Sequence, residues 1–204
     1  MRILIANKFY YPRGGDCIYT FELEKLLKKN GHDVVIFSQN HPNNYKNQYS
    51  NYWPSEINYS SINITNVRES LIRPVYSKEI YNKYNELIDY FKPDVVHLNN
   101  IHTQLSPLIA EISYNNDIPV VWTLHDFKIL CPAQVCMRNG EICELCFTNK
   151  VNVIKYRCVK NIVGSIIAYI EAIKWNLDNI NKFTSYFITP SAFMKQKMIQ
   201  GGLY

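Results

Sequence analysis

Four short apolar segments, each followed at once by a polar cluster, recur along the chain. They are Arg2–Asn7, Asp94–Leu98, Pro119–Leu124 and Tyr186–Thr189. Uninterrupted apolar runs of this length are typical of strands buried on both faces of a parallel sheet. A fifth such segment, Val34–Phe37, completes a strand–helix–strand unit with the first. The pattern predicts a parallel sheet whose strands end in loops rich in Gly, His, Asn and Asp.

Segments with helical spacing separate these strands. After Asp16, a candidate N-cap, apolar residues recur at helical intervals, which predicts a helix. Asn30-Gly31 ends this helix. The stripe consists of Tyr19, Leu23, Leu26 and Leu27. Further helices are predicted at Tyr76–Phe91, Leu105–Tyr114, Ser165–Ile180 (with an apolar stripe of Ile166, Ile170, Ile173 and Leu177) and from Ser191 to Gly201-Gly202. The alternation predicts an α/β fold with a doubly wound, mostly parallel, Rossmann-like sheet flanked by helices.

Two stretches fall outside this alternation. Gln39–Thr65 is rich in Asn, Tyr and Ser, and we expect a surface excursion with one short strand at Glu56–Tyr59. Residues 127–160 carry most of the cysteines and predict an irregular insertion. We expect residues 1–204 to form one Rossmann-like domain that contains this insertion.

Composition narrows the function classes. Of 204 residues, 47% are apolar and 19% charged, which argues against disorder. The 22 basic and 17 acidic residues give a net charge of +5, scattered rather than clustered, so nucleic acid is not an expected partner. Neither a secretory signal nor an apolar run long enough to span a bilayer is visible. Cytoplasm is the expected location.

The loops after the predicted strands carry the candidate chemistry. Gly14-Gly15 would let a ligand approach the backbone at a helix N-terminus, or they form only a tight turn. His125-Asp126 could donate to a hydroxyl or stabilise a leaving group, or they are structural. Asn99 and His102 suit hydroxyl recognition. No dinucleotide or P-loop fingerprint is present. Because ligands of parallel α/β sheets bind at the carboxyl ends of the strands, we expect Gly15, His102 and His125 to converge on one site.

Five of the six cysteines lie between residues 131 and 158. Cys143 and Cys146 form a C-x2-C pair after a turn at Asn139-Gly140, as in half of a zinc knuckle. With Cys131 and Cys158 they would complete a four-thiolate structural zinc site, and Cys136 would be left out. Free thiols, and less readily disulfides, are the alternatives.

Four basic residues lie where the insertion ends: Lys150, Lys155, Arg157 and Lys160. They form either a solvated surface or a patch that contacts anionic lipid.

Several segments, taken in order, resemble the N-terminal half of family 4 glycosyltransferases of GT-B fold. They are FYYPRGGDCIYTFELEKLLKKNGHDVVIFS, PDVVHLNNIHTQLSPLI, IPVVWTLHDFKILCP and FITPSAFMKQKMIQGG. The insertion, with its C-P, C-x2-C and later R-C, resembles a subgroup that acts in bacterial surface polysaccharide synthesis.

The resemblance implies site roles. Gly14 and Gly15 would face the donor phosphate and the acceptor, and His125 would lie close to the donor sugar as the catalytic residue. Asn99, His102 and Asp126 would contact substrate, and Ser191 would lie near a hinge between two domains.

The resemblance also implies the reaction. The enzyme would transfer a sugar from a nucleotide-sugar donor to a glycan or lipid-linked acceptor, with retention and without a catalytic metal, at the inner face of the cell membrane. The second domain, with its E-x7-E element and most donor contacts, is absent from this chain, so we expect the fragment alone to be inactive. The alternative is a non-catalytic module that binds a glycan or phosphorylated ligand and is held together by a structural metal.

Overall fold

The computed structural model describes residues 1–57 and 71–204, which form two compact units. The first contains Met1–Thr123 and Phe183–Ile188, and the second contains Leu124–Lys182 and Thr189–Tyr204. The predicted strand at Glu56–Tyr59 extends outside the described residues, and its first two positions are not in a strand.

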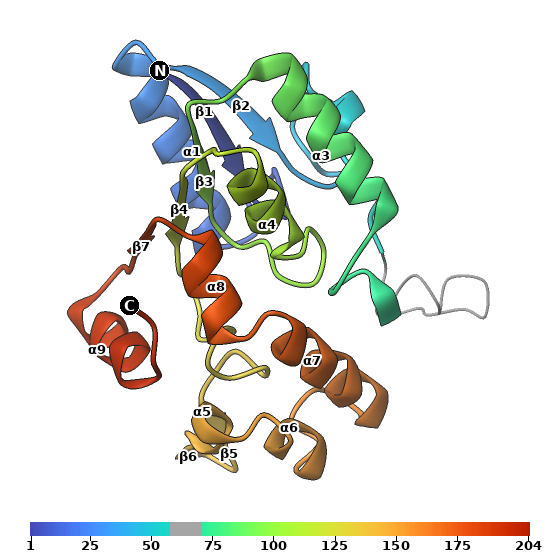
Figure 1. The fold of residues 1–204 in the computed structure, drawn as a ribbon, viewed down its shortest axis with the longest axis vertical. Helices are drawn as coiled ribbons and strands as arrows, with labels where there is room; N and C mark the ends of the chain where they lie inside the picture. The colour runs from blue at the N-terminus through green and yellow to red at the C-terminus, as the bar shows by residue number, and fades with distance from the viewer. Residues whose placement is uncertain (58–70) are drawn as a thin grey trace. The chain divides into compact units, whose positions relative to one another are not determined.

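The first unit is built on a five-stranded parallel sheet (Figure 1). Its order is β2-β1-β3-β4-β7, and all four neighbouring pairs are parallel. The strands are β1 (Arg2–Ala6), β2 (Asp33–Phe37), β3 (Val95–Leu98), β4 (Val120–Thr123) and β7 (Tyr186–Ile188). The doubly wound parallel sheet predicted from the apolar segments is therefore confirmed. In this order the winding direction changes between β1 and β3, which is where such sheets bind ligands.

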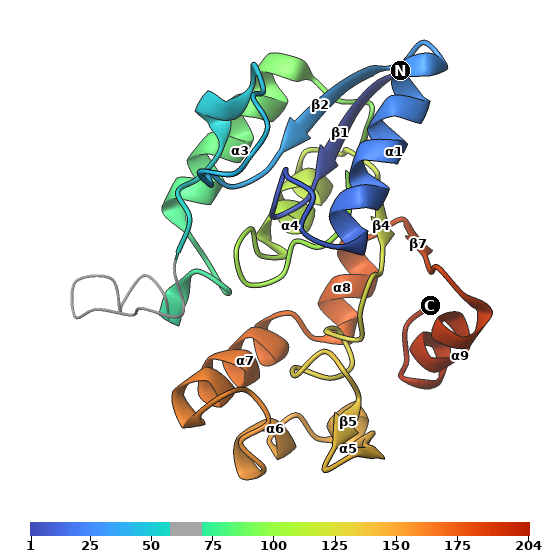
Figure 2. The same ribbon diagram turned by 180° about the vertical axis from the view of Figure 1, so that it is seen from behind.

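Helices cover both faces of this sheet. α1 (Gly15–Lys29) lies on one face, and α3 (Lys78–Phe91) and α4 (Leu108–Asn115) lie on the other (Figures 1 and 2). A short 3-10 helix, η1 (Ser50–Tyr52), lies between β2 and α3 in the chain. The Tyr84 hydroxyl and the Ser113 hydroxyl, 2.7 Å apart, join α3 to α4.

Two details of α1 differ from the prediction. Gly14 is the N-cap residue, and Asp16 lies inside the first turn instead of capping it. Leu26 is 56% exposed, because the buried side of the helix contains Cys17, Thr20 and Glu24. The carboxylate of Glu24 can be buried there because it accepts a hydrogen bond from the Tyr10 hydroxyl at 2.7 Å and from Lys28 Nζ at 2.6 Å.

The second unit contains the cysteine-bearing insertion, which is largely irregular as predicted. Its regular elements are short: β5 (Met137–Arg138) and β6 (Glu141–Ile142), which pair antiparallel, then α5 (Leu145–Thr148) and α6 (Asn152–Lys155). α7 (Ile162–Lys174), α8 (Leu177–Phe183) and α9 (Ala192–Gln200) follow. α9 begins at Ser191, whose hydroxyl accepts from Met194 N, and it stops at Gly201, so both predicted boundaries are confirmed.

The predicted single helix at Ser165–Ile180 is wrong. α7 ends at Lys174 with Trp175 as its C-cap, and α8 begins at Leu177. Asn176 Oδ1 accepts a hydrogen bond from Asn179 N at 3.0 Å, as an N-cap side chain does, which favours a new helix start. The apolar stripe through Ile166, Ile170 and Ile173 is exposed instead of packed in a core.

Candidate ligand site

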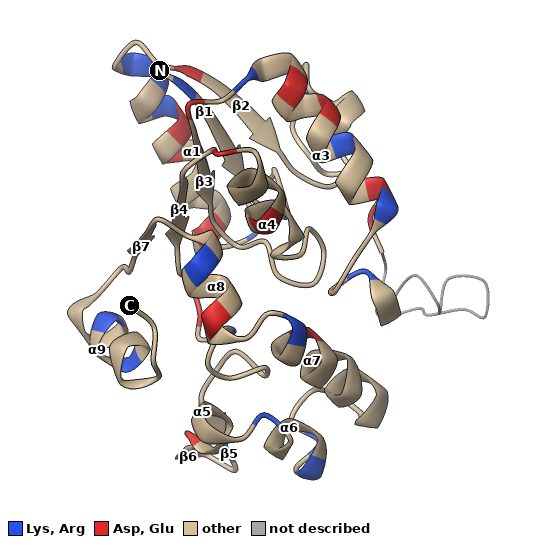
Figure 3. Cartoon of the chain, viewed as in Figure 1, with Lys and Arg blue, Asp and Glu red and all other residues tan. Residues whose placement is uncertain are grey.

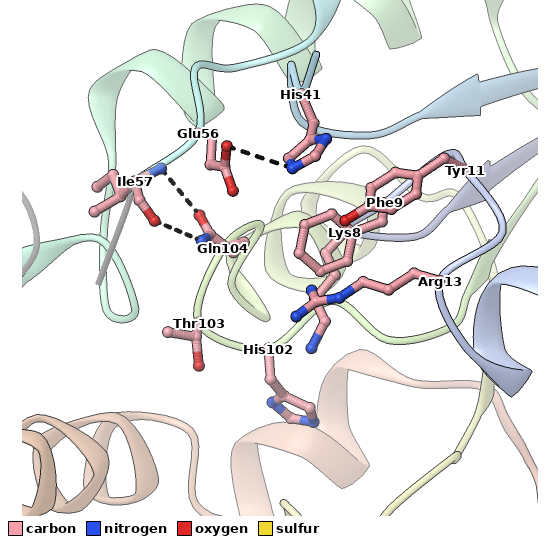
Figure 4. A pocket seen from close by; sticks show the side chains of 10 residues that line it. All are labelled: Lys8, Phe9, Tyr11, Arg13, His41, Glu56, Ile57, His102, Thr103 and Gln104. Carbon is pink, nitrogen blue, oxygen red and sulfur yellow. Dashed lines mark hydrogen bonds and ion pairs between the residues drawn. The ribbon is translucent and has the colours of Figure 1, made fainter. Parts of the chain in front are cut away.

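A cavity of about 300 Å³ lies among the loops that follow β1, β2 and β3 (Figure 4). Its volume is at the lower end of the range for small-molecule sites. The lining residues come from three segments: Lys8, Phe9, Tyr11 and Arg13 after β1; His41, Glu56 and Ile57 after β2; and His102, Thr103 and Gln104 after β3. The cavity therefore lies at the carboxyl edge of the sheet, beside the β1/β3 switch point.

A buried asparagine, Asn7, joins the first and third of these loops. Its Nδ2 donates to Phe9 O at 2.9 Å, and its Oδ1 accepts from Asn100 N at 3.1 Å. Lys8 N also donates to Asn100 O at 2.9 Å. An asparagine at the end of a strand can bond to two backbone segments at once, because its side-chain amide carries both a donor and an acceptor. Asn7 thus holds two walls of the cavity at a fixed separation.

Gln104 fixes the opposite wall. Its Nε2 donates to Ile57 O at 2.8 Å, and its Oε1 accepts from Ile57 N at 3.3 Å (dashed in Figure 4). Thr103 and Ser106 have positive φ angles of 68° and 62°, an arrangement that non-glycine residues adopt only when the surroundings hold them. The Ser106 hydroxyl supplies one such restraint by donating to Pro74 O at 2.8 Å.

Three aromatic side chains line one side of the cavity. Tyr11 stacks on His41 with ring centroids 4.6 Å apart and an interplanar angle of 17°. Phe9 meets both rings edge-on, at 5.5 Å from Tyr11 and 5.7 Å from His41. Flat aromatic surfaces of this kind can cover the apolar face of a sugar or another ring.

The charges that line the cavity are mainly positive. The Arg13 guanidinium lies 4.1 Å from the centroid of the Phe9 ring, and Lys8 Nζ lies 5.9 Å from it. Glu56, whose Oε2 is 3.9 Å from His41 Nε2, supplies the one carboxylate among the lining residues. With both histidines neutral, Lys8, Arg13 and Glu56 give the lining a net charge of +1. Such a lining favours an anionic ligand.

Of the residues predicted to bind substrate, His102 lines this cavity. Its ring is buried and lies 5.3 Å from the Trp122 ring. Asn99 is 1% exposed and is not a lining residue; its carbonyl accepts from Trp122 Nε1 at 2.9 Å. Asn99 therefore positions Trp122, which in turn packs on His102.

Gly14 and Gly15 lie just beyond Arg13 but do not line the cavity. Gly14 is extended, with φ −164°, and neither glycine has the positive φ that would require glycine. A Cβ on Gly15 would meet nothing within 4 Å, and one on Gly14 would lie 3.2 Å from Asp16 Oδ1. Neither backbone conformation nor packing thus explains a glycine at position 15.

His125, Asp126 and Ser191 belong to the second unit. Asp126 Oδ1 accepts from Lys128 N at 2.8 Å, and the Ser191 hydroxyl caps α9. Both side chains thus have local structural roles. The convergence of His125 with Gly15 and His102 on one site stays a prediction.

The cysteines of the insertion affect one another electrostatically. A hydrogen bond from the Cys136 thiol is the main cause that lowers the pKa of Cys131 to about 6, and the same contact raises the pKa of Cys136. Burial raises the pKa of Cys146 to about 11, with the charges of Cys131 and Cys158 adding to it.

Within residues 1–57 and 71–204, no three His, Cys, Asp or Glu side chains are grouped so that they could hold a metal ion. The structure thus supplies no ligand set, and the zinc site at Cys131, Cys143, Cys146 and Cys158 stays a prediction.

The sequence analysis did not single out most of the lining residues. Lys8, Phe9, Tyr11 and Arg13 lie in the loop that precedes Gly14. His41 follows the end of β2 by a few residues, so the rule that ligands bind beyond the carboxyl ends of strands could have found it. Glu56 and Ile57 were expected in a short surface strand, and no sequence signal places them at the cavity.

The fold and the cavity define an α/β domain with a small, mainly positively charged cavity beside the switch point of its parallel sheet. No helix in the described ranges is long and apolar enough to cross a membrane. The sequence profile described as Glycosyltransferase Family 4 matches residues 13–203. The chain belongs to glycosyltransferase family 4.

Three similar proteins illustrate the range of the likeness. The chain is 24% identical over 219 residues to an uncharacterized 42.6 kDa protein in the cps region of Klebsiella pneumoniae, and it spans 52% of that protein's length. Among solved structures, UDP-GlcNAc 2-epimerase from Methanocaldococcus jannaschii has 13% identity and a TM-score of 0.49, covering 100% of this chain and 43% of the epimerase. SsfS6, a glycosyltransferase from Streptomyces sp. SF2575, has 16% identity and a TM-score of 0.38. The match covers 62% of this chain and 40% of SsfS6.

Proposed function

We propose that this chain is the acceptor-side half of a GT-B glycosyltransferase in bacterial polysaccharide biosynthesis. The enzyme transfers a sugar from a nucleotide-sugar donor to a glycan or lipid-linked acceptor, with retention of configuration, at the cytoplasmic face of the cell membrane. The cavity beside the β1/β3 switch point is the observation that carries the proposal. Family membership supports it independently.

The cavity favours an acceptor with a negative charge. Lys8 and Arg13 supply permanent positive charges, and His41 and His102 can add to them. Tyr11 and His41 present a stacked aromatic surface for the apolar face of one sugar ring. A sugar unit that carries a phosphate or a carboxylate matches both features. The small volume suits one such unit rather than an extended glycan.

The remaining residues have proposed roles in transfer. Gly14 and Gly15 leave space for the donor phosphate to approach the start of α1. The position that a Cβ of residue 15 would occupy is open, with no atom within 4 Å of it beyond its chain neighbours and the local helix backbone. His125 lies at the donor sugar, where it stabilises charge as the nucleoside diphosphate leaves. Asp126 contacts substrate, and Ser191 lies near the hinge. Because a developing oxocarbenium ion and its leaving group must be held together, residues 1–204 by themselves should not transfer a sugar.

Binding to the cavity is tested on this chain directly. Saturation-transfer NMR with hexose phosphates, hexuronic acids and the matching neutral sugars should show binding of the charged sugars only. Arg13→Gln should weaken that binding about tenfold, in line with the loss of one charge-assisted hydrogen bond. Lys25→Gln, on the exposed side of α1, is the control that removes the same charge elsewhere. Equal binding of charged and neutral sugars, or equal loss in both variants, contradicts the proposed acceptor class.

Transfer is tested on the full-length protein. Nucleoside diphosphate release from a panel of nucleotide sugars should depend on the added acceptor. His125→Ala should reduce it about a hundredfold or more. Gly15→Ala should reduce it without destabilising the fold, since an added Cβ finds no atom within 4 Å beyond its chain neighbours and the local helix backbone, and alanine is favoured over glycine in a helix. Ligand binding without release from any donor would support the non-catalytic binding module instead.

A further inference from the structure

The loop after β2 buries a side-chain amide that has no hydrogen-bond partner. Gln39 is 0% exposed, and neither its Nε2 nor its Oε1 bonds to any residue in the described part of the chain. Among those residues it is the one buried amide with both atoms unpaired. A buried amide in this state costs free energy, because it has lost its bonds to water without gaining others. Such a group in a native protein calls for an explanation.

A second unpaired atom lies in the loop after β3. Asn100 Oδ1 is buried and has no partner within residues 1–57 and 71–204. The backbone carbonyl of Asn100 accepts from Lys8 N at 2.9 Å, so the residue lies beside the cavity lining. In the chain Asn100 precedes the lining residue His102 by two positions. Gln39 precedes the lining residue His41 by the same interval.

The backbone at Gln39 is bonded to two other walls of the cavity. The Gln39 carbonyl accepts from Asn44 Nδ2 at 2.7 Å, and Asn44 Oδ1 accepts from Tyr10 N at 3.1 Å in the lining loop after β1. The next residue, Asn40, donates its N–H to Pro54 O at 2.8 Å, in the segment that leads to lining residues 56 and 57. Gln39 therefore lies where the β2 loop meets these walls.

The unpaired atoms match a neutral ligand group. They comprise one NH₂ donor, on Gln39, and two carbonyl acceptors, on Gln39 and Asn100. A phosphate or carboxylate offers only acceptors and cannot pair with the two carbonyls. Residues 34–45 and 95–110, which contain both side chains, include no Lys, Arg, Asp or Glu and are tan in Figure 3. The anionic group of the ligand therefore binds elsewhere in the cavity, at Lys8 and Arg13.

We propose that Gln39 and Asn100 recognise the acetamido group of an N-acetylated sugar. A trans amide presents its carbonyl and its N–H on opposite edges, so it needs a donor on one side and an acceptor on the other. Gln39 Nε2 donates to the acetamido oxygen, and Asn100 Oδ1 accepts from the acetamido N–H. This inference rests on the proposed function, because it names the class of sugar that the same cavity binds.

The spacing of the sheet favours an acetamido group over a hydroxyl. β2 and β3 are both neighbours of β1, so their backbones lie about 10 Å apart. An amide that is hydrogen-bonded at both edges spans about 8 Å between its two partner atoms. A hydroxyl bonded on both sides spans at most about 5.5 Å. The longer bridge thus fits side chains that approach from the two outer loops.

Ligand binding requires Gln39 to turn. Its side chain is not part of the cavity lining in this structure, but it has three rotatable bonds through which the amide can reach the ligand. The turn removes the cost of the unpaired amide, so a ligand with an acetamido group favours the turned conformation.

Two sugar phosphates that differ only at carbon 2 test the proposal on the 204-residue chain. N-acetyl-α-D-glucosamine 1-phosphate should bind at least about tenfold more tightly than α-D-glucose 1-phosphate in NMR titrations, because it gains two hydrogen bonds. Equal affinities overturn the proposal and leave the proposed function intact. Binding of neither compound overturns both.

Substitution of Gln39 separates recognition from structure. Gln39→Met keeps the length of the side chain and should abolish the preference, with the affinity for glucose 1-phosphate unchanged. The same variant should raise the urea midpoint, because it removes a buried unpaired amide. Gln48→Met, at an exposed position of the same connection, should change neither quantity. Asn100→Ala, which retains its backbone hydrogen bonds, should reduce the preference about threefold.

Two results with these variants overturn the proposal. One is a ratio of the two affinities that Gln39→Met leaves unchanged. The other is a urea midpoint that falls in Gln39→Met, since the amide then has a permanent partner and a purely structural role.

Discussion

Removal of one partner of the buried ion pair between Lys128 and Glu171 should be among the most destabilising single substitutions in the second unit. The two charged atoms lie 3.1 Å apart, and the side chains are 8% and 4% exposed. Lys128 Nζ also donates to Pro132 O at 3.0 Å. Glu171→Gln keeps the shape of the side chain but leaves a buried ammonium group without its counter-charge. Loss of one partner of such a pair costs about 3–5 kcal/mol.

Native-state hydrogen exchange measures this cost locally. At 1.36 kcal/mol per factor of ten, exchange over residues 162–174 should accelerate by about two to nearly four orders of magnitude. Peptides from β1 and β3 in the first unit provide an internal reference. Glu144→Gln is the matched control, because Glu144 pairs with Lys197 at a site where both side chains are about a third exposed, and exposed pairs contribute about 1 kcal/mol or less.

A compensating variant distinguishes the lost charge from a packing defect. Lys128→Met with Glu171→Leu replaces the pair by apolar groups of similar size and should restore stability to within about 1 kcal/mol. If Glu171→Gln accelerates exchange by less than about threefold, the pair is not desolvated. The role of the pair in fixing which side of α7 is buried would then be contradicted.

Three further predictions concern other parts of the chain. Thr123→Val removes the hydroxyl that lies 2.8 Å from His97 Nε2 in the core, so urea unfolding should show a loss of about 1–3 kcal/mol, whereas Thr123→Ser should lose less; equal losses contradict this. Ser191→Ala should destabilise α9 by about 1 kcal/mol, and Ser191→Asp should restore it; hydrogen exchange over α9 that does not change would refute the capping role. Metal analysis of reduced protein tests the proposed zinc site at the cysteines, and a content under roughly a tenth of an equivalent removes it.

Local patterns predicted the sheet because buried parallel strands must be apolar on both faces. Every strand of the sheet was expected within one or two residues, and so was the cap at Ser191. Periodicity alone could not show which side of a helix faces the core. For α1 and α7 the buried side includes Glu24 and Glu171, carboxylates that only a tertiary partner makes tolerable there.

The candidate site was predictable only in part for a related reason. His102 directly follows a strand, so its place at the carboxyl edge follows from the fold class. Glu56 and Ile57 reach the cavity through a long connection after β2, and Gln104 holds Ile57 there by two hydrogen bonds. Such pairings between distant segments leave no trace in local composition. The aromatic stack of Tyr11 on His41 was missed for the same reason.

The double attachment made by Asn7 has a consequence for affinity. Because one amide bonds to both the β1 and β3 loops, the two walls are already ordered before any ligand arrives. The conformational entropy of these loops is then lost during folding and not again on association. The proposed ligand, a single sugar unit, makes few contacts, so this preorganisation would allow it to be held without an extended interface. Substitution of Asn7 would weaken ligand affinity even though its side chain does not line the cavity.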